Sequence, residues 1–166
     1  MDISIRQLSE DDWQLFRDIR LKGLKHDHGA FSARYETEIQ KTDQEWQKTL
    51  LNNDTGIFAI FDGPNQIGIT AIGIHWEDPE KKRALLWASW LEPAYRGKGI
   101  SKLMYAARLN WAHAHPTCEK VVVTVMRDNL PSKRAIESNG FLYSHIEERR
   151  GENDIAFPVL HYELNL

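Results

Sequence analysis

Three strand-like runs follow one another in the middle of the chain, and this arrangement limits the folds open to it. Residues 57–61, 67–76 and 84–91 are apolar and rich in β-branched and aromatic side chains, as strands are. The turn sequence Asp-Gly-Pro-Asn at 62–65 separates the first two runs, and the charged run 77–83 predicts a hairpin tip before the third. The centre of the chain therefore predicts successive hairpin-like strands.

The segment before these strands predicts one more strand and two helices. Residues 3–8 alternate apolar and polar side chains, which is typical of a half-buried strand. Ser9 and Asp12 resemble a helix-capping pair, and Thr42 and Glu45 form a second capping box. Apolar residues at helical spacing follow each pair, so we expect a helix after each of them.

The segment after the strands alternates between helices and strands. Apolar residues recur at helical spacing over 100–114. The β-branched run 121–125 is typical of a buried strand, and the glycine that ends 131–140 is a natural C-cap for a helix there. Closing strands are predicted at 141–146 and 159–164. The order β-α-α-β-β-β-α-β-α-β-β predicts a mixed α/β sheet with helices on both faces.

Two charged or polar segments are interpreted as irregular. Residues 26–38 lie between the first two helices, and we expect His26 and His28 to face water because connections lie on the surface by default. Residues 147–150, Glu-Glu-Arg-Arg, are interpreted as a solvated turn.

Length and charge limit the function. The 166 residues suffice for one domain with a core, so we expect a single domain over 1–166. The net charge is -3 without a sustained basic tract, which disfavours a nucleic-acid partner. The chain has no apolar run of the ~18 residues that a membrane span needs, and its start does not resemble a signal peptide. With one cysteine, which cannot form an internal disulfide, these features predict a cytoplasmic protein.

A metal site is not expected. His113 and His115 stand near Cys118, and these residue types bind zinc. Residues two apart on a helix point about 200° away from each other, however, so the pair cannot chelate while it is helical. Solvated histidines at a helix end are expected instead.

The most informative stretch for function is 91–101, where a strand passes into a helix. Gly97 and Gly99 let a ligand approach the backbone, and the free N–H groups of the first helical turn favour an anion. Arg96 and Lys98 add positive charge at the same place. These features predict a cradle for a diphosphate. The alternative is a tight turn with two solvated basic residues.

Two better-known phosphate loops do not fit this stretch. A Walker loop needs Gly-Lys followed by Ser or Thr, whereas Lys98 is followed by Gly99. The dinucleotide fingerprint needs another glycine three residues after the second one, and Lys102 stands there.

The stretch resembles motif A of the GNAT superfamily of N-acetyltransferases, Arg/Gln-x-x-Gly-x-Gly/Ala. Arg96 and Gly99 fit the pattern, and Ser101 replaces the last small residue with a slightly larger one. A later segment resembles the family's motif B, an Asn after the next strand with a Gly-Phe pair that ends twelve residues later. Here Asn129 opens a helix that closes with Gly-Phe at 140–141.

The resemblance implies a fold and a co-substrate. The family's fold is a twisted, mostly antiparallel sheet with one splayed parallel strand pair, which admits the pantetheine arm of acetyl-coenzyme A (acetyl-CoA). It also implies that a backbone N–H, freed by a bulge in the strand before motif A, polarises the thioester carbonyl. The residues implied in acetyl-CoA binding are Leu91, Arg96, Gly97, Lys98, Gly99, Ile100, Ser101, Asn129 and Ser132.

The implied reaction is acetyl transfer by direct attack of a primary amine, with a small molecule as the acceptor. Two alternatives stay open: a protein or peptide N-acetyltransferase, and an acyl-CoA sensor without turnover. Many family members place a tyrosine seven residues after the motif B asparagine to protonate the leaving thiolate. Ile136 occupies that position here, so the acid role falls to Ser132, to Tyr143 or to water.

The acceptor pocket is expected between the connection after the first helix and the strand at 84–91. Phe31, Tyr35 and Glu36 from the connection, with Trp87 from the strand, make an aromatic wall with one carboxylate, which suits a cation. The expected partner is therefore a small-molecule amine, with no nucleic acid and no membrane. A homodimer is compatible with the sequence.

Overall fold

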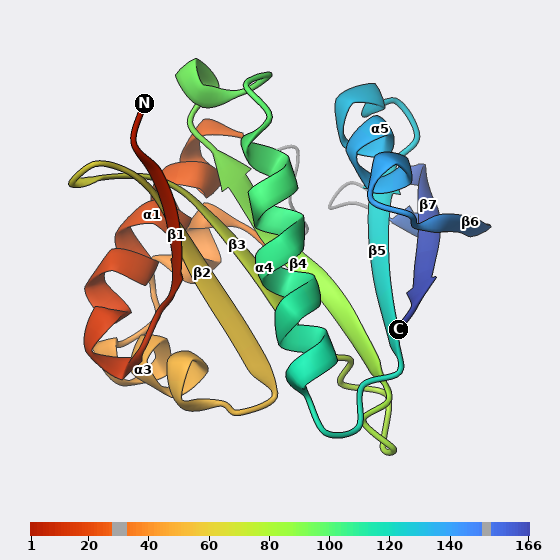
Figure 1. Ribbon diagram of the computed structural model, residues 1–166, viewed down its shortest axis with the longest axis horizontal. Coiled ribbons are helices and arrows are strands. Elements are labelled where there is room, and N and C mark those ends of the chain that lie inside the picture. The colour runs from red at the N-terminus through yellow and green to blue at the C-terminus, as the bar shows by residue number, and fades with distance from the viewer. Residues whose placement is uncertain (28–32, 151–153) are drawn as a thin grey trace.

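The computed structural model describes residues 1–27, 33–150 and 154–166. These residues form the mixed α/β sheet and flanking helices that the sequence predicts (Figure 1). The helices are α1 (Trp13–His26), α2 (Tyr35–Glu38), α3 (Asp43–Leu51), α4 (Ile100–Ala114) and α5 (Leu130–Ser138). The strands are β1 (Ile3–Gln7), β2 (Thr55–Asp62), β3 (Asn65–Ile74), β4 (Arg83–Leu91), β5 (Lys120–Met126), β6 (Leu142–Arg150) and β7 (Ala156–Asn165).

The strands lie in one sheet in the order β1-β2-β3-β4-β5-β7-β6. Neighbouring strands pair antiparallel, except that β4 and β5 pair parallel. The connection between these two strands contains α4, as a parallel crossover requires. Figure 1 shows β4 and β5 side by side where they begin and diverging toward their ends. The predicted fold, with its splayed parallel pair, is confirmed.

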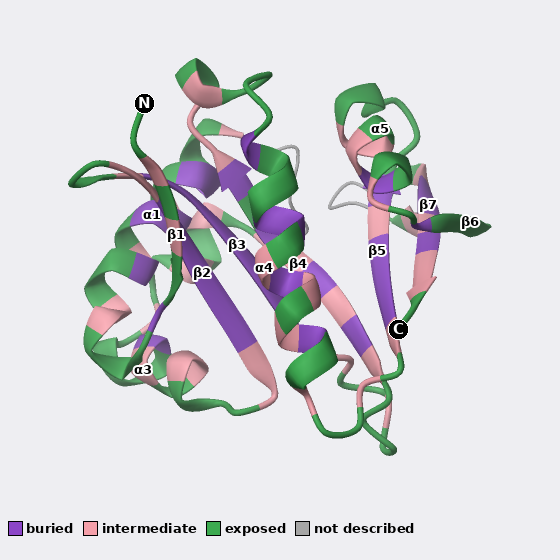
Figure 2. Ribbon diagram, viewed as in Figure 1, coloured by how far each residue is buried: buried purple, intermediate pink, exposed green. Residues whose placement is uncertain are grey.

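Helices cover both faces of the sheet. One buried cluster contains Tyr105 of α4 and Ile136 of α5, and another contains Phe16 of α1 and Trp46 of α3. Phe58 of β2 belongs to the first cluster and its two neighbours in the strand belong to the second. Because successive strand residues point to opposite faces, α4 and α5 lie on one face and α1 and α3 on the other. Figure 2 shows buried residues along β2 to β5, whereas β6 is exposed along its length.

Strand β4 carries a bulge near its end. Ala71 of β3 pairs with Trp87, and Ile69 pairs with Trp90, so two residues of β4 lie opposite one of β3. The first of the two, Ala88, has a φ of 52°, in the left-handed region that few non-glycine residues adopt. The bulge therefore interrupts the backbone pairing of β4 just before the glycine-rich stretch.

The predicted helix caps are present. Thr42 Oγ1 accepts a hydrogen bond from the Glu45 N–H at 3.3 Å, and a Glu45 carboxylate oxygen accepts one from the Thr42 N–H at 2.7 Å. The Asp12 carboxylate accepts a hydrogen bond from the Ser9 N–H at 2.9 Å, where a 3₁₀ turn at 10–12 leads into α1. Gly140 has a φ of 86° after α5, as a C-cap glycine does.

Both segments interpreted as irregular contain regular structure. Helix α1 extends through His26, and 35–38 form the single turn α2. The Glu-Glu-Arg-Arg stretch belongs to β6 and pairs with β7, with Glu147 opposite Val159, so the interpretation as a turn is wrong. An exposed edge strand tolerates charged residues because both faces and one edge meet water. His28 and Phe31 lie outside the described residues.

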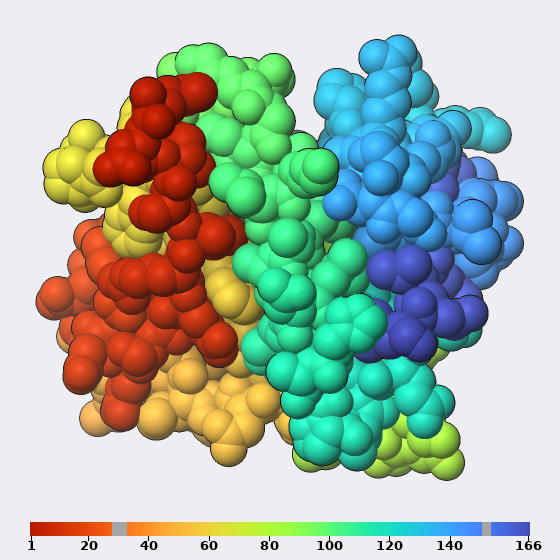
Figure 3. Space-filling model, viewed as in Figure 1, coloured from red at the N-terminus to blue at the C-terminus, as the bar shows by residue number. Residues whose placement is uncertain are grey.

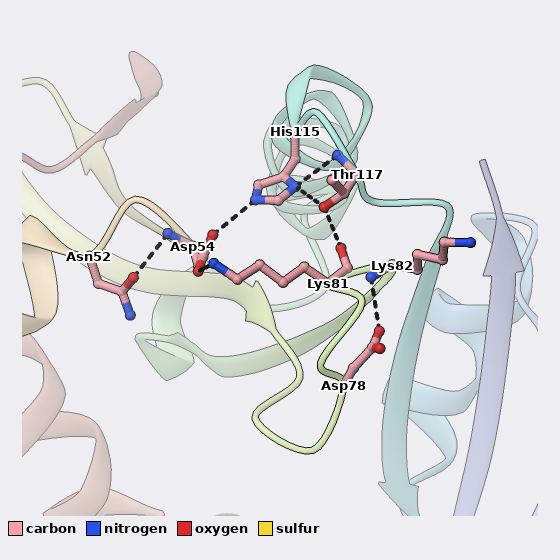
Figure 4. Close-up of polar contacts among 7 residues, drawn as sticks. All are labelled: Asn52, Asp54, Asp78, Lys81, Lys82, His115 and Thr117. Carbon is pink, nitrogen blue, oxygen red and sulfur yellow. Dashed lines mark hydrogen bonds and ion pairs between the residues drawn. The ribbon is translucent and has the colours of Figure 1, made fainter.

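His115 is not solvated, contrary to expectation. Its side chain is 8 % exposed, and its Nε2 lies 3.2 Å from Asp54 Oδ1 (Figure 4). The Lys81 ammonium donates to the other Asp54 oxygen at 2.8 Å, and Thr117 Oγ1 donates to the Lys81 carbonyl at 2.7 Å. These bonds tie the end of α4 to the start of β2 and to the β3–β4 hairpin. Among the described residues, no group of three or more His, Cys, Asp or Glu could hold a metal ion. None of the described helices has the length and apolar character of a membrane span.

Candidate active site

The glycine-rich stretch forms an open loop at the start of α4. Gly99 is the residue before the helix, with a φ of 80°, and Gly97 has a φ of 73°. A Cβ added at either position would meet nothing within 4 Å. The space beside both glycines is thus free for a ligand, and the first N–H groups of α4 are not used by the helix itself. This arrangement fits an anionic group such as a diphosphate.

The loop lies at the edge where β4 and β5 part. Pairing between the two strands joins residues 83–85 to 120–122, and 86–91 of β4 and 123–126 of β5 extend beyond it. The loop follows β4 and Asn129 follows β5, so both motifs lie at the carboxyl ends of parallel neighbours, where open α/β sheets bind ligands. Figure 3 shows a hollow in the surface between the start of α4 and α5. An elongated ligand with an anionic group can lie on the loop and extend between the strands.

The side chain of Arg96 is held within the protein. Its guanidinium forms an ion pair with Asp27 at the end of α1, and its Nε donates to the Leu91 carbonyl at 2.9 Å. The Trp90 indole N–H donates to the same Asp27 oxygen at 2.6 Å. Burial opposes ionisation of Asp27, but the hydrogen bonds from Arg96 and Trp90 outweigh it and lower the pKa of Asp27. Sequence reasoning did not find Asp27, because 69 residues separate it from Arg96.

A second contact joins the glycine-rich loop to the end of β2. The Tyr95 hydroxyl donates to Asp62 at 3.0 Å, and this bond raises the pKa of Tyr95. The Lys98 ammonium lies 5.4 Å from the centre of the Tyr95 ring, within the range of a cation–π contact. This contact holds the Lys98 side chain at the loop that also contains the two glycines.

A buried arginine lies behind the bulge of β4. Arg108 of α4 is 2 % exposed; its Nε donates to the Met104 carbonyl at 3.0 Å and its Nη1 donates to Ser89 Oγ at 2.8 Å. Its guanidinium also lies 4.5 Å from the centre of the Tyr105 ring. Burial lowers the pKa of Arg108 to about 10, so the side chain stays charged at neutral pH. A positive charge thus stands next to the bulge, and the helical pattern alone does not reveal it.

The motif B residues cap α5. Asn129 Oδ1 accepts a hydrogen bond from the Ser132 N–H at 3.3 Å, and both residues follow the carboxyl end of β5. Ile136 is 1 % exposed and belongs to the core cluster under α4 and α5. Tyr143 lies on β6, and β5 and β7 separate it from β4. The structure therefore places Ser132 in the first turn of α5, after the carboxyl end of β5, and places Tyr143 two strands away from β5.

The residues expected at the acceptor are only partly described. Trp87 of β4 packs against the cluster under α1 and α3, and the guanidinium of Arg20 of α1 lies 5.9 Å from its ring. Arg20 is 7 % exposed; burial lowers its pKa, and the charge of Glu38 in α2 acts against that. Tyr35 and Glu36 lie on α2, where Glu36 is exposed. The structure thus places Trp87 and α2 on the same face, with Arg20 and Glu38 as charged neighbours that the sequence did not single out.

An open depression lies elsewhere on the molecule. Its volume is about 630 Å³. It lies at the end of the sheet where β4 and β5 begin, opposite the glycine-rich loop. Its lining is mostly charged and consists of Glu77, Asp78, Lys82, Arg83, Glu119, Lys120, Asn165 and Leu166. The candidate active site is therefore the loop and the parting strands.

The sequence matches the family model for the acetyltransferase (GNAT) domain over residues 2–142. The chain therefore belongs to the GNAT acetyltransferase family, a family of N-acetyltransferase enzymes, as its two motifs indicate. No curated protein gives a significant match.

Solved structures show the same fold. The chain is similar to an acetyltransferase of the GNAT family from Streptococcus pneumoniae, with 18% identity over 99% of each chain and a TM-score of 0.81. It is similar to the ribosomal-protein-S5-alanine acetyltransferase of Vibrio fischeri, with 15% identity over 99% of this chain and 93% of that one and a TM-score of 0.80. It is also similar to yncA of Salmonella typhimurium, solved with acetyl-CoA, with 14% identity over 100% and 95% and a TM-score of 0.78.

Proposed function

We propose that this chain transfers the acetyl group of acetyl-CoA to the primary amine of a small molecule, by direct attack of the amine on the thioester. The observation that carries the proposal is the parting of β4 and β5 beside a bulge and an open glycine loop. The diphosphate of acetyl-CoA binds the N–H groups at 97–101 and the charge of Lys98. The arm lies along the unpaired edge of β4, with Asn129 and Ser132 on the opposite side.

The bulge and Arg108 support the chemical step. The bulge frees a backbone N–H to donate to the thioester carbonyl oxygen, on which negative charge develops as the amine attacks. The guanidinium of Arg108, which donates to Ser89 in the bulge, adds positive charge behind this position. Ser132 or water protonates the departing thiolate.

A peptide N-terminus is the second candidate acceptor. The favouring observation is the similarity to the Vibrio fischeri enzyme, which acetylates alanine of a ribosomal protein by its description. The third candidate is a sensor that binds acetyl-CoA without turnover. A measurement of acetyl transfer distinguishes it from the two enzymes. The single domain, the homodimer and the cytoplasmic location stay predictions.

The test is release of free thiol from acetyl-CoA with four acceptors: spermidine, mixed amino acids, an aminoglycoside and a peptide with an N-terminal alanine. We expect thiol release and a singly acetylated product with a small amine. Product with the peptide alone favours the second candidate, and calorimetric binding of acetyl-CoA without thiol release favours the sensor. A chain that does not bind acetyl-CoA overturns the proposal.

A further inference from the structure

Two histidines and a glutamate meet on the β6–β7 hairpin, away from the residues assigned above. The ring of His161 in β7 stacks on His145 in β6, with centroids 4.2 Å apart and an angle of 17° between the planes. His161 Nε2 lies 2.6 Å from a carboxylate oxygen of Glu147. The side chain of His161 is 18 % exposed and that of Glu147 is 46 % exposed, so the histidine is largely shielded and its carboxylate partner is open to solvent.

The strand register places His161 in line with the gap between β4 and β5. Leu85 and Val122 are the last paired residues of these strands, and Trp87 and Thr124 lie two positions further on each. Thr124 pairs directly with His161. Because residues directly opposite each other share a face, and residues two apart in a strand do too, Trp87, Thr124 and His161 form one row on one face. This row of three residues extends across the gap between β4 and β5.

This row lies on the face that an acceptor would approach. Trp87 packs with the cluster under α1 and α3, whereas the glycine loop leads into α4 on the other face. Neighbouring strands are about 4.8 Å apart, so His161 lies about one strand spacing beyond Thr124, with β5 between it and the gap. An amine that reaches the thioester from this face passes over Thr124, the strand partner of His161, and a bound water can bridge the remaining distance to His161.

The hydrogen bond to Glu147 prepares His161 as a proton acceptor. When Nε2–H donates to the carboxylate, Nδ1 carries the lone pair. Burial lowers the pKa of His161, and the charges of His145 and Arg149 act in the same direction; the hydrogen bond that His161 donates to Glu147 acts against them. Glu163, two residues further along β7, also faces this side and is paired with Lys120 at 2.9 Å. The imidazole is therefore neutral at neutral pH and able to accept a proton.

We propose that His161 is the catalytic base that takes the proton from the attacking amine, with Glu147 as the residue that positions it. The proposal rests on the proposed function. The lone pair of the amine forms a C–N bond to the thioester carbon, and the C–S bond breaks with its electron pair on sulfur. The extra proton on the new nitrogen passes through a bound water to Nδ1 of His161. His161 then releases it to water, and the thiolate takes a proton from Ser132 or from water.

The test measures kcat/KM against pH, from about pH 5 to 9, with the acceptor that reacts fastest in the panel above. The variants are His161→Gln and Glu147→Gln. Their matched controls are His113→Gln, at the exposed end of α4, and Glu148→Gln, the neighbour of Glu147 in the strand. Circular dichroism and acetyl-CoA calorimetry check that each variant folds and binds, and His161→Asn replaces His161→Gln if the latter misfolds.

The expected results separate a base from a structural residue. The wild-type rate falls at acidic pH as His161 becomes protonated. His161→Gln lowers kcat/KM about 10²–10⁴-fold and removes that acidic limb. Glu147→Gln lowers the rate less and moves the limb to lower pH, because the bond that raises the pKa of His161 is gone. The two control variants keep the wild-type profile.

This design distinguishes a failure of the proposed base from a failure of the proposed function. A folded His161→Gln variant with the wild-type rate and acidic limb overturns the proposed base while leaving acetyl transfer intact. A wild-type chain that acetylates none of the acceptors overturns the proposed function, and the base is rejected with it.

Discussion

Arg96 shows how a motif can locate a residue without revealing its partners. The sequence assigns its positive charge to a diphosphate. In the structure, the guanidinium pairs with Asp27 and donates to the Leu91 carbonyl. The charge of Arg96 is thus largely neutralised, and we expect the backbone N–H groups and Lys98 to make the first contacts to a diphosphate. At the scale of the residue, Arg96 holds the loop to the end of α1.

The role of the loop backbone can be tested by placing a side chain in its open space. We expect Gly99→Leu to lower the affinity for acetyl-CoA strongly, because the new side chain occupies the space beside the first turn of α4. It should also cost roughly 1–2 kcal/mol of stability, because a φ of 80° strains a residue with a Cβ. Calorimetric titration with acetyl-CoA and urea unfolding measure the two effects.

Gly63 provides the matched control. It also has a left-handed φ, of 54°, and a Cβ there would likewise meet nothing within 4 Å, but it lies in the β2–β3 turn. Gly63→Leu should cost similar stability and leave the affinity for acetyl-CoA unchanged. Equal affinities in both variants would contradict a ligand at the glycine loop.

Ile136 marks a limit of prediction from sequence. Motif spacing identifies it as the position where many relatives carry a tyrosine, and the sequence does not tell whether the side chain faces the ligand. The structure places it at 1 % exposure in the core. A tyrosine there would have to displace packed side chains, and close-packed interiors resist such overpacking. The structure therefore adds that the side chain at this position is part of the core.

At the scale of elements, the start of α1 depends on one carboxylate. Asp12 accepts two hydrogen bonds from Arg6 of β1, each at 2.8 Å, and another from the Ser9 N–H. The hydrogen bond from Arg6 holds the pKa of Asp12 well below its ordinary value. The carboxylate thus joins the first strand to the first helix.

This pair predicts a pH-dependent stability. The pKa of Asp12 is lower in the folded chain than in the unfolded one, so its contribution is present above the unfolded value of ~3.9 and is lost as pH falls below it. We expect Asp12→Asn to lower the free energy of unfolding by about 1 kcal/mol at neutral pH, a figure reduced because solvent screens a partly exposed pair. The difference from wild type should shrink below about pH 4.

Urea unfolding at several pH values measures this effect. Asp11→Asn is the matched control, since Asp11 is the exposed neighbour in the same turn. A stability loss for Asp12→Asn that persists unchanged into acid would show that the charge of Asp12 is not its cause.

Local sequence patterns predicted most of the helices and strands. The features that they did not predict depend on how the strands pair. The capping box of Thr42 and Glu45 and the turn at 62–65 act between near neighbours, so they can be recognised in the sequence. The charged end of β6 could not, because its pairing with β7 depends on contacts across the hairpin. For the same reason the sequence gives no sign that Glu147 meets His161 or that the bulge falls at Ala88.

At the scale of the whole molecule, the sheet consists of two parts that separate where β4 and β5 diverge. Three residue pairs join β4 to β5, and Tyr105 of α4 lies 5.9 Å from Phe141 at the end of α5, ring centre to ring centre. Strands β1–β4 lie on one side of this division and β5–β7 on the other. The core cluster under α4 and α5 also spans both parts. A ligand between β4 and β5 therefore contacts both parts and adds to these connections.

Acetyl-CoA should accordingly slow the opening of the two parts relative to each other. A ligand that binds only the folded chain stabilises it by about 2.7 kcal/mol at a concentration of 100 Kd. We expect the largest slowing of amide hydrogen exchange in 86–91 and 123–126, the strand ends beside the gap, and little change in β1, which lies far from it. The same measurement on Gly99→Leu should show no slowing at that acetyl-CoA concentration, because that variant does not hold the diphosphate. Protection spread evenly over all strands would mean that the ligand acts on global unfolding alone, and protection confined to the glycine loop would mean that the arm does not enter between β4 and β5.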